Sequence, residues 1–172
     1  MLQLILGGAR SGKSRLAEQI AKETGLSVIY IATAQALDTE MQQRIAHHQQ
    51  QRPADWQVFE EPTYLADRLL QCDQANQLIL VDCSTLWLSN LLLAEDSALQ
   101  QQQIQQLLNV LPQLKSKIIL VSNETGLGVV PMGELSRRFV DEAGRLHQNL
   151  GQLANKVVFC VAGFPMILKD EK

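Results

Sequence analysis

The chain has 172 residues, of which 46% are hydrophobic and 19% charged, and 15 Lys and Arg residues against 18 Asp and Glu residues give a net charge of -3. This length and composition are typical of one soluble domain covering residues 1–172, because two separate halves would each bury little apolar surface. The mild negative charge argues against a protein that binds nucleic acid mainly by neutralising its phosphates.

The three cysteines, Cys72, Cys83 and Cys160, are odd in number and lie far apart. They suggest neither a disulfide framework nor a zinc site, so we expect a cytoplasmic protein. The apolar start Met1–Leu6 lacks the basic residues of a signal peptide, and no later apolar run approaches the roughly 18 residues that span a bilayer. Membrane insertion is not expected.

Short apolar runs alternate with longer segments of helical period, which predicts an α/β fold with a mainly parallel sheet flanked by helices. The expected strands are Leu2–Leu6, Ser27–Ala32, Leu78–Asp82, Lys117–Ser122 and Lys156–Ala162. In the third and fourth of these strands the apolar residues are consecutive, and such strands are buried on both faces.

The first predicted strand leads directly into Gly7-Gly8-Ala9-Arg10-Ser11-Gly12-Lys13-Ser14, a full match to the phosphate-binding motif G-x-x-x-x-G-K-[ST]. Its glycines let backbone N–H groups turn toward phosphate oxygens, and the helix that follows adds its positive N-terminal end. Lys13 is expected to reach the β- and γ-phosphates, and the Ser14 hydroxyl to bind Mg²⁺. The strand–loop–helix setting makes a plain glycine turn a poor alternative.

The next predicted helix enters at Asp38 or Thr39, ends at Pro53 and carries two adjacent histidines. His48 shares a face with Met41 and Ile45, whereas His47 is rotated about 100° away. A neutral imidazole can attack phosphorus and hold the transferred group as a phosphoramidate, which makes His48 a candidate nucleophile. On spacing alone, a half-buried packing role for His48 is favoured over the nucleophilic one.

Asp82 ends the third predicted strand, where a second acidic ligand of the magnesium ion is expected. The alternative is that Asp82 caps the helix that begins near Thr85. Trp56 and Trp87 are expected in the core or at an interface.

Two helices are predicted in the second half of the chain. The glutamine-rich stretch Gln100–Gln106 reads as part of a solvated surface helix closed by Pro112, and an apolar stripe runs through the segment Gly133–Asn155, where His147 is expected at the surface. Between them, Glu124 follows the fourth strand, where it is placed either to orient an attacking hydroxyl or simply to serve a loop.

Taken together, the phosphate motif, the segment Arg44-Ile45-x-x-His48 and the loop Asn123-Glu124-x-Gly126 closely resemble the bifunctional adenosylcobinamide kinase / adenosylcobinamide-phosphate guanylyltransferase family of cobalamin biosynthesis. The resemblance extends over nearly the whole chain. It implies a RecA-like P-loop NTPase fold, a homo-oligomer, and the use of GTP, ATP and Mg²⁺. It also implies two substrates, adenosylcobinamide and adenosylcobinamide phosphate.

The resemblance further implies that Lys13 and His48 are catalytic and that His48 carries GMP as a covalent intermediate. By the same matching, the expected contacts of the guanine nucleotide are Thr33, Ala34, Gln35, Gln49, Gln50, Gln51, Arg52, Glu60 and Asp82. Gln49 stands where many relatives have a basic residue. A carboxylate suits guanine because it accepts hydrogen bonds from N1–H and the 2-amino group, but Glu60 and Glu61 both qualify, and either is also placed to act as a charge at a helix N-terminus.

Two other functions use the same phosphate motif. One is a nucleotide-dependent switch or motor, and the other is a simple kinase in which His48 has only a structural role.

Overall fold

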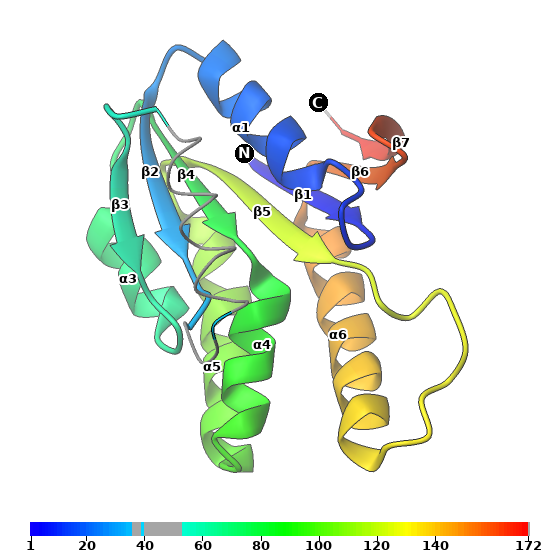
Figure 1. Cartoon of the computed structure of the whole chain (residues 1–172). Coiled ribbons are helices and arrows are strands. Elements are labelled where there is room, and N and C mark those ends of the chain that lie inside the picture. Colours follow the sequence, from blue (N-terminus) through cyan, green and yellow to red (C-terminus); the bar gives the residue numbers. More distant parts are fainter. Residues whose placement is uncertain (36–38, 40–52, 172) are drawn as a thin grey trace.

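The computed structural model describes residues 1–35, 39 and 53–171, and in them the chain forms one seven-stranded sheet of order β3-β2-β4-β5-β1-β6-β7 (Figure 1). The strands are β1 (Leu2–Gly7), β2 (Ser27–Ala32), β3 (Gln57–Glu60), β4 (Gln77–Asp82), β5 (Lys117–Asn123), β6 (Lys156–Val161) and β7 (Phe164–Asp170). Neighbouring strands pair in parallel except for β6 and β7, which are antiparallel. The predicted mainly parallel sheet is therefore confirmed.

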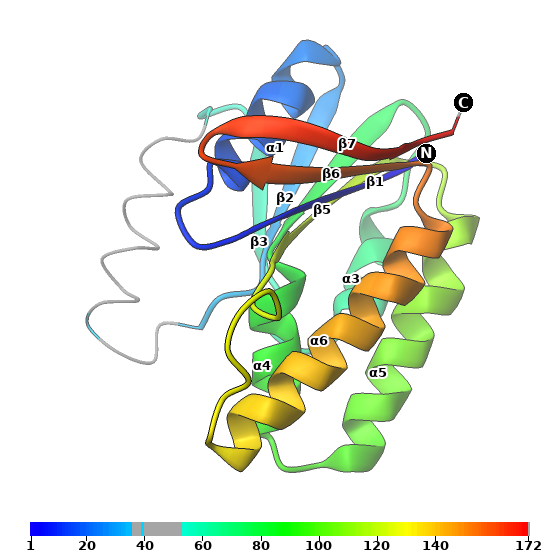
Figure 2. The same ribbon diagram turned by 90° about the vertical axis from the view of Figure 1, so that its right-hand side faces the viewer.

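Helices cover both faces of this sheet, as Figure 2 shows. They are α1 (Lys13–Glu23), α3 (Leu65–Cys72), α4 (Ser84–Leu93), α5 (Ser97–Val110), the short 3-10 helix η1 (Leu111–Gln113) and α6 (Glu134–Leu153). Helix α1 lies on one face, and α3, α4, α5 and α6 lie on the other. The helix expected between Asp38 and Pro53, with His47 and His48, lies outside the described residues.

The central strands are buried on both faces, as their consecutive apolar residues predict. Leu4 packs in the cluster that includes Trp87 of α4 and Leu146 of α6, whereas the adjacent Ile5 packs in the cluster that includes Ala17 of α1. Successive side chains of a strand point to opposite faces, so the sheet has a hydrophobic layer on each side. Trp56 and Trp87 are both buried, which confirms their predicted place in the core.

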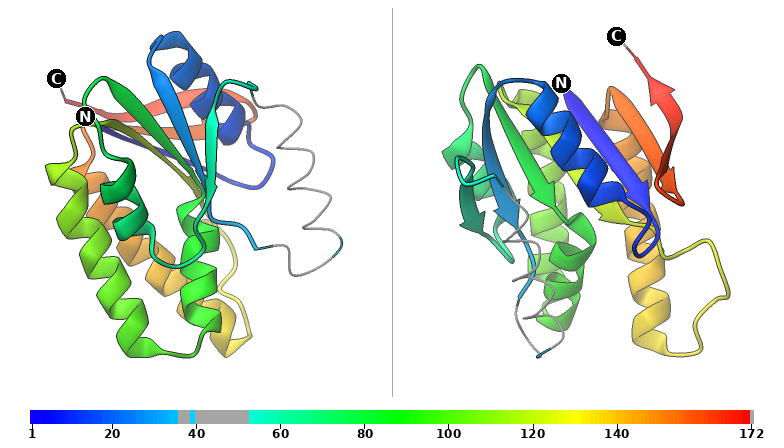
Figure 3. Two further views of the ribbon diagram at one scale, coloured as in Figure 1. Left: turned by 90° about the vertical axis from the view of Figure 1, so that its left-hand side faces the viewer. Right: turned by 45° about the horizontal axis from the view of Figure 1, so that its top comes forward.

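Two strands were not predicted, and they occupy the two edges of the sheet (Figure 3). Strand β3 has only four residues, and most of the apolar side chains of β7 are exposed, so neither shows the pattern of a buried strand. The prediction that the fifth expected strand, Lys156–Ala162, ends at Ala162 was wrong: β6 ends at Val161, and Ala162 and Gly163 both have positive φ, 50° and 85°. They form the two-residue turn of a β-hairpin, for which positive φ at both positions is typical.

The two long helices of the second half are present, with two differences. Gln100 and Gln103 of α5 are buried, and Gln100 accepts a hydrogen bond from Arg138 Nη2 at 2.9 Å, so the glutamine-rich helix is only partly solvated. His147 is buried on α6, so the prediction that it lies at the surface was wrong. Both nitrogens of its imidazole lie near polar side chains. None of the described helices is long and apolar enough to cross a membrane.

Replacing a core residue of β4 should test the two-sided packing. Leu80 is fully buried in the cluster beneath α1, so Leu80→Ala should lower the free energy of unfolding by about 2–5 kcal/mol, through lost transfer energy and a residual cavity. Urea denaturation followed by circular dichroism measures this. Leu70→Ala on α3, where the side chain is 52% exposed, is the matched control and should cost far less; equal losses would contradict the packing.

Candidate functional site

The segment between β1 and α1 forms a tight loop over the N-terminus of α1. Arg10 and Gly12 both have positive φ, 55° and 94°, and Gly12 is the N-cap of α1. Because glycine has no side chain to cap the helix, the first N–H groups of α1 stay free of a side-chain acceptor at that position. A loop that ends on such a helix N-terminus is suited to bind anions, phosphate above all.

Close packing explains why the first residue of the loop is a glycine. The C-terminal part of the chain contributes to this packing. A Cβ on Gly7 would lie 2.5 Å from Ser11 Oγ and 2.8 Å from the Cys160 carbonyl oxygen, which no side chain tolerates. The Gly163 N–H donates to the Ser11 carbonyl at 2.9 Å, so the turn between β6 and β7 supports the loop. The Ser11 hydroxyl is buried without a hydrogen-bond partner among the described residues, which fits a polar ligand at the loop.

Lys13 lies across this loop and joins it to β5. Its Nζ donates to the Gly8 carbonyl at 3.1 Å and to Asn123 Oδ1 at 2.9 Å. Asn123 is itself held, because its N–H donates to Thr85 Oγ1 at 2.8 Å. Sequence reasoning did not select Asn123 as a site residue, although its place as the last residue of a strand beside β1 was a usable signal.

Asp82 is the last residue of β4 and lies at the same carboxyl end of the sheet as the phosphate loop. Strand β5 lies between β4 and β1. The Tyr30 hydroxyl donates to Asp82 Oδ2 at 3.1 Å. The N-cap of α4 is Cys83 and no side chain caps that helix, so the structure does not support capping as the role of Asp82. Burial, and secondarily the charge of Asp82, raise the pKa of the Cys83 thiol to about 11, which keeps this thiol protonated and unreactive near pH 7.

A buried polar network joins the ends of β2 and β4. Thr33 Oγ1 donates to the Cys83 carbonyl at 2.7 Å and accepts from the Cys83 N–H at 2.9 Å, so this fully buried hydroxyl already has both its partners. Asn90 Nδ2 donates to the carbonyls of Thr33 and Pro62, at 2.8 and 3.0 Å. The network fixes the start of the segment Ala34–Gln35, whose nucleotide contacts remain predictions.

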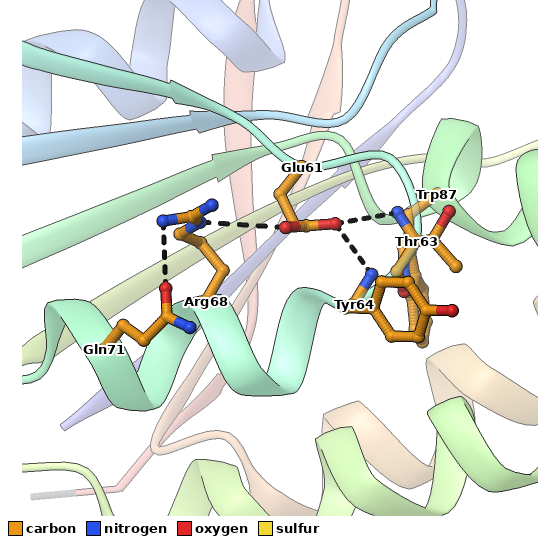
Figure 4. Close-up of polar contacts among 6 residues, drawn as sticks. All are labelled: Glu61, Thr63, Tyr64, Arg68, Gln71 and Trp87. Carbon is orange, nitrogen blue, oxygen red and sulfur yellow. Dashed lines mark hydrogen bonds and ion pairs between the residues drawn. The ribbon is translucent and has the colours of Figure 1, made fainter.

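The structure gives Glu60 and Glu61 different surroundings. Glu61 Oε1 accepts from the N–H groups of Thr63 and Tyr64 at 3.2 and 2.8 Å, and Oε2 lies 3.7 Å from Arg68 Nε (Figure 4). Glu61 therefore serves the start of α3, which is the helix-terminal role considered for it. Glu60 ends β3 beside Ala32, and its side chain is exposed. Of the two carboxylates, Glu60 is the one still available to a guanine.

The remaining predicted contacts, Gln49 to Arg52 together with His48, lie outside the described residues. A groove of about 470 Å³ between α5 and α6 is lined by residues such as Gln101, Ile104 and Arg138, and none of its lining residues belongs to the phosphate loop. This groove is therefore separate from the site at the edge of the sheet.

A mainly parallel sheet whose first strand leads into a phosphate-binding loop and helix defines a P-loop NTPase. Solved structures agree on the fold: a protein of Pyrococcus horikoshii OT3 has a TM-score of 0.58 at 12% identity, covering 99% of this chain and 87% of its own, and the RadB recombinase has 0.52 at 16% identity, covering 92% and 73%. The chain belongs to the cobinamide kinase / cobinamide phosphate guanyltransferase family, which matches residues 3–168.

Curated relatives match end to end. The bifunctional adenosylcobalamin biosynthesis protein CobP of Pseudomonas aeruginosa is 59% identical over 171 residues, covering 99% of both chains. The proteins named bifunctional adenosylcobalamin biosynthesis protein CobU from Escherichia coli and Salmonella typhimurium are each 39% identical over 183 residues, covering 98% of this chain and all of theirs. The resemblance found in the sequence motifs is thereby confirmed at the level of the family.

The different surroundings of the two glutamates give a prediction about nucleotide selection. Glu60→Gln should weaken GTP binding about tenfold or more and leave ATP binding nearly unchanged, because it would remove the charged acceptor expected for guanine N1–H and the 2-amino group, which adenine lacks. Titration calorimetry with both nucleotides measures this.

The matched variant Glu61→Gln should lower the melting temperature, since Glu61 accepts from two backbone N–H groups at the start of α3, without changing the ratio of GTP to ATP affinity. A loss of GTP preference in Glu61→Gln alone would reverse the assignment.

Proposed function

We propose that this chain phosphorylates the aminopropanol hydroxyl of adenosylcobinamide with a nucleoside triphosphate and then transfers GMP from GTP to the resulting phosphate, in the synthesis of cobalamin. Family membership supports both activities. The observation that carries the proposal is Lys13 held over the phosphate loop by Gly8 and Asn123. There its ammonium group is placed to neutralise phosphate oxygens, as phosphoryl transfer requires.

Mg²⁺ bound with the nucleotide would be held by Ser14 and Asp82. Both residues offer oxygen ligands, and both lie at the carboxyl edge of the sheet, in the first turn of α1 and at the end of β4. Mg²⁺ usually keeps several waters and binds through one or two protein ligands together with phosphate oxygens, so these two residues suffice. Such an ion supplies charge neutralisation for the phosphates.

Guanylyl transfer would proceed through His48. Its imidazole nitrogen forms a bond to the α-phosphorus of GTP while the bond to the bridging oxygen breaks, and pyrophosphate leaves. In the second step an oxygen of adenosylcobinamide phosphate attacks the same phosphorus and the P–N bond breaks, which returns a neutral imidazole. The support for His48 comes from the helix-face argument and the family motif.

Labelled GTP tests this covalent step. Incubation with GTP labelled at the α-phosphate should leave label on the denatured protein, and acid should remove it because phosphoramidates are acid-labile. His48→Ala should abolish the label, whereas His47→Ala, which changes the adjacent imidazole, should retain it. Addition of adenosylcobinamide phosphate should chase the label into product.

Two other outcomes point to other functions. Steady NTP hydrolysis without covalent label would indicate a nucleotide-dependent switch. Transfer of γ-phosphate to adenosylcobinamide without any α-label would indicate a simple kinase in which His48 is structural.

We also propose that the protein forms a homo-oligomer in the cytoplasm through β7. This edge strand carries Phe164, Met166, Ile167 and Leu168, each more than half exposed, and exposed apolar groups of this size on an open sheet edge favour association with a second copy. The location in the cytoplasm is supported by the three cysteines, all of which are free thiols.

Light scattering tests the oligomer. The wild-type protein should have a mass of at least twice the 19.2 kDa of one chain, and Ile167→Lys should shift it toward the monomer by placing a charge in the contact. Leu70→Lys on α3, a residue of similar exposure, is the control and should leave the mass unchanged. A wild-type mass of one chain would contradict the proposal.

A further inference from the structure

A chain of polar contacts runs from β5 into the middle of α6, next to the phosphate loop. Glu124 is the first residue after β5, and its N–H donates to the Gly7 carbonyl at 2.9 Å. The preceding residue, Asn123, accepts from Lys13 Nζ. Glu124 therefore begins the loop that leaves β5 directly beside the phosphate-binding segment, which Figure 1 shows at the carboxyl ends of β1 and β5.

The carboxylate of Glu124 is held at both oxygens. Oε1 accepts from the Gly126 N–H at 2.5 Å, and Oε2 lies 3.3 Å from His147 Nδ1. The Glu124 side chain is 19% exposed, so the carboxylate is fixed by the protein and still open to solvent on one side. A carboxylate held in this way loses little freedom when it receives a further hydrogen bond from a bound hydroxyl.

His147 is in turn fixed from the opposite side. Its side chain is 8% exposed, and Nε2 lies 2.7 Å from Ser122 Oγ, a fully buried hydroxyl of β5. Burial lowers the pKa of His147 more than the charge of Glu124 raises it, so the imidazole is neutral near pH 7. With Nδ1 facing a carboxylate, the proton belongs on Nδ1, and Nε2 accepts from the Ser122 hydroxyl.

We propose that His147 is a positioning residue for phosphoryl transfer: its Nδ1–H holds the Glu124 carboxylate beside the phosphate loop, where that carboxylate accepts the proton of the attacking hydroxyl. In this step the substrate oxygen forms a bond to the γ-phosphorus while the bond from the γ-phosphorus to the β–γ bridging oxygen breaks. The nucleoside diphosphate leaves, and the hydroxyl proton passes to Glu124 and then to water. The inference rests on the proposed kinase activity and adds two residues to it.

The two polar contacts of His147 explain why α6 has a buried histidine among the apolar residues Ala143, Leu146 and Leu150. A buried imidazole costs desolvation energy that an apolar residue at the same place would not. Both ring nitrogens have partners, and one partner is the carboxylate of Glu124, whose backbone N–H bonds to Gly7 of the phosphate loop. Such supporting hydrogen bonds typically change activity by about 10- to 100-fold when they are removed, because they set the orientation of the group that reacts.

The test compares two replacements of His147. His147→Leu removes both nitrogens at similar volume, whereas the amide of His147→Asn can still donate near the position of Nδ1. We expect His147→Leu to lower kcat for transfer of γ-phosphate to adenosylcobinamide about 10- to 100-fold, with KM for the nucleotide little changed. His147→Asn should recover most of that loss. Covalent labelling by α-labelled GTP, which does not use Glu124, should persist in both.

Further variants separate positioning from folding. Glu124→Gln should lower kcat by about 100-fold or more, and adding His147→Leu to it should cost little further, because both changes act through one carboxylate. Ser122→Ala removes only the partner of Nε2 and should lower kcat by a few fold, which keeps the test available if His147→Leu fails to fold. Asn149→Leu, an exposed residue of the same helix, is the control for thermal stability and rate.

Three results would overturn the inference. One is a proportional loss of kcat, covalent labelling and folded fraction in His147→Leu with no recovery in His147→Asn, since that pattern marks a structural role. Another is full kinase activity in Glu124→Gln. The third is a wild-type protein that transfers no γ-phosphate to adenosylcobinamide, which would overturn the proposed kinase function at the same time and is distinguished by the failure of the wild type itself.

Discussion

The parallel pairing of β1 with β5 is the constraint on which the phosphate site depends. Its register sets Gly7 opposite Asn123, so the first residue of the phosphate loop lies beside the last residue of β5. Lys13 then reaches Asn123 from the first turn of α1. Because side chains alternate along a strand, a slip of one residue would turn Asn123 to the other face of the sheet and remove this partner. Alternate side chains of both strands pack into the two hydrophobic layers, and a slip would disrupt that packing.

The same register explains why residues distant in sequence share one site. Parallel strands all finish at the same end of the sheet. The carboxyl ends of β1, β4 and β5 therefore bring Lys13, Asp82 and Glu124 to that end. The polar network of Thr33 and Asn90 adds the end of β2 to this edge. The edge is thus built almost wholly from strand ends and the turns that follow them, while the helices supply support from either face.

The central part of the fold could be predicted because its strands carry an unambiguous signal. Runs such as Ile79-Leu80-Val81 are too short for a helix and too apolar for a loop. The edge strands gave no such signal: β3 has four residues, and β7 exposes most of its apolar side chains to solvent. Their place in the sheet is decided by pairing with a neighbour and not by burial, and pairing is not visible in the composition of a single segment.

The site could be predicted only as far as local motifs reach. The phosphate motif is contiguous, so its residues can be recognised directly in the sequence, while their contacts with phosphate stay predictions. Asn123 and His147 were missed because their roles come from contacts across the sheet, and His147 was misplaced because a histidine beside an apolar helical stripe is usually solvated. Glu60 and Glu61 could not be told apart from their order alone, and only the start of α3 separates them. The nucleophilic role of His48 stays a prediction, since that segment lies outside the described residues.

The hairpin of β6 and β7 limits the length of the connection between these two strands. Its two-residue turn brings the Gly163 N–H to the Ser11 carbonyl, and a Cβ on Gly12 would lie 3.3 Å from Gly163 Cα. One inserted residue there would carry the N–H away from Ser11 and loosen the phosphate loop, although some 150 residues of chain separate the two. Hairpin loops usually tolerate insertions, but here the length of the connection is dictated by a ligand site at the other end of the polypeptide.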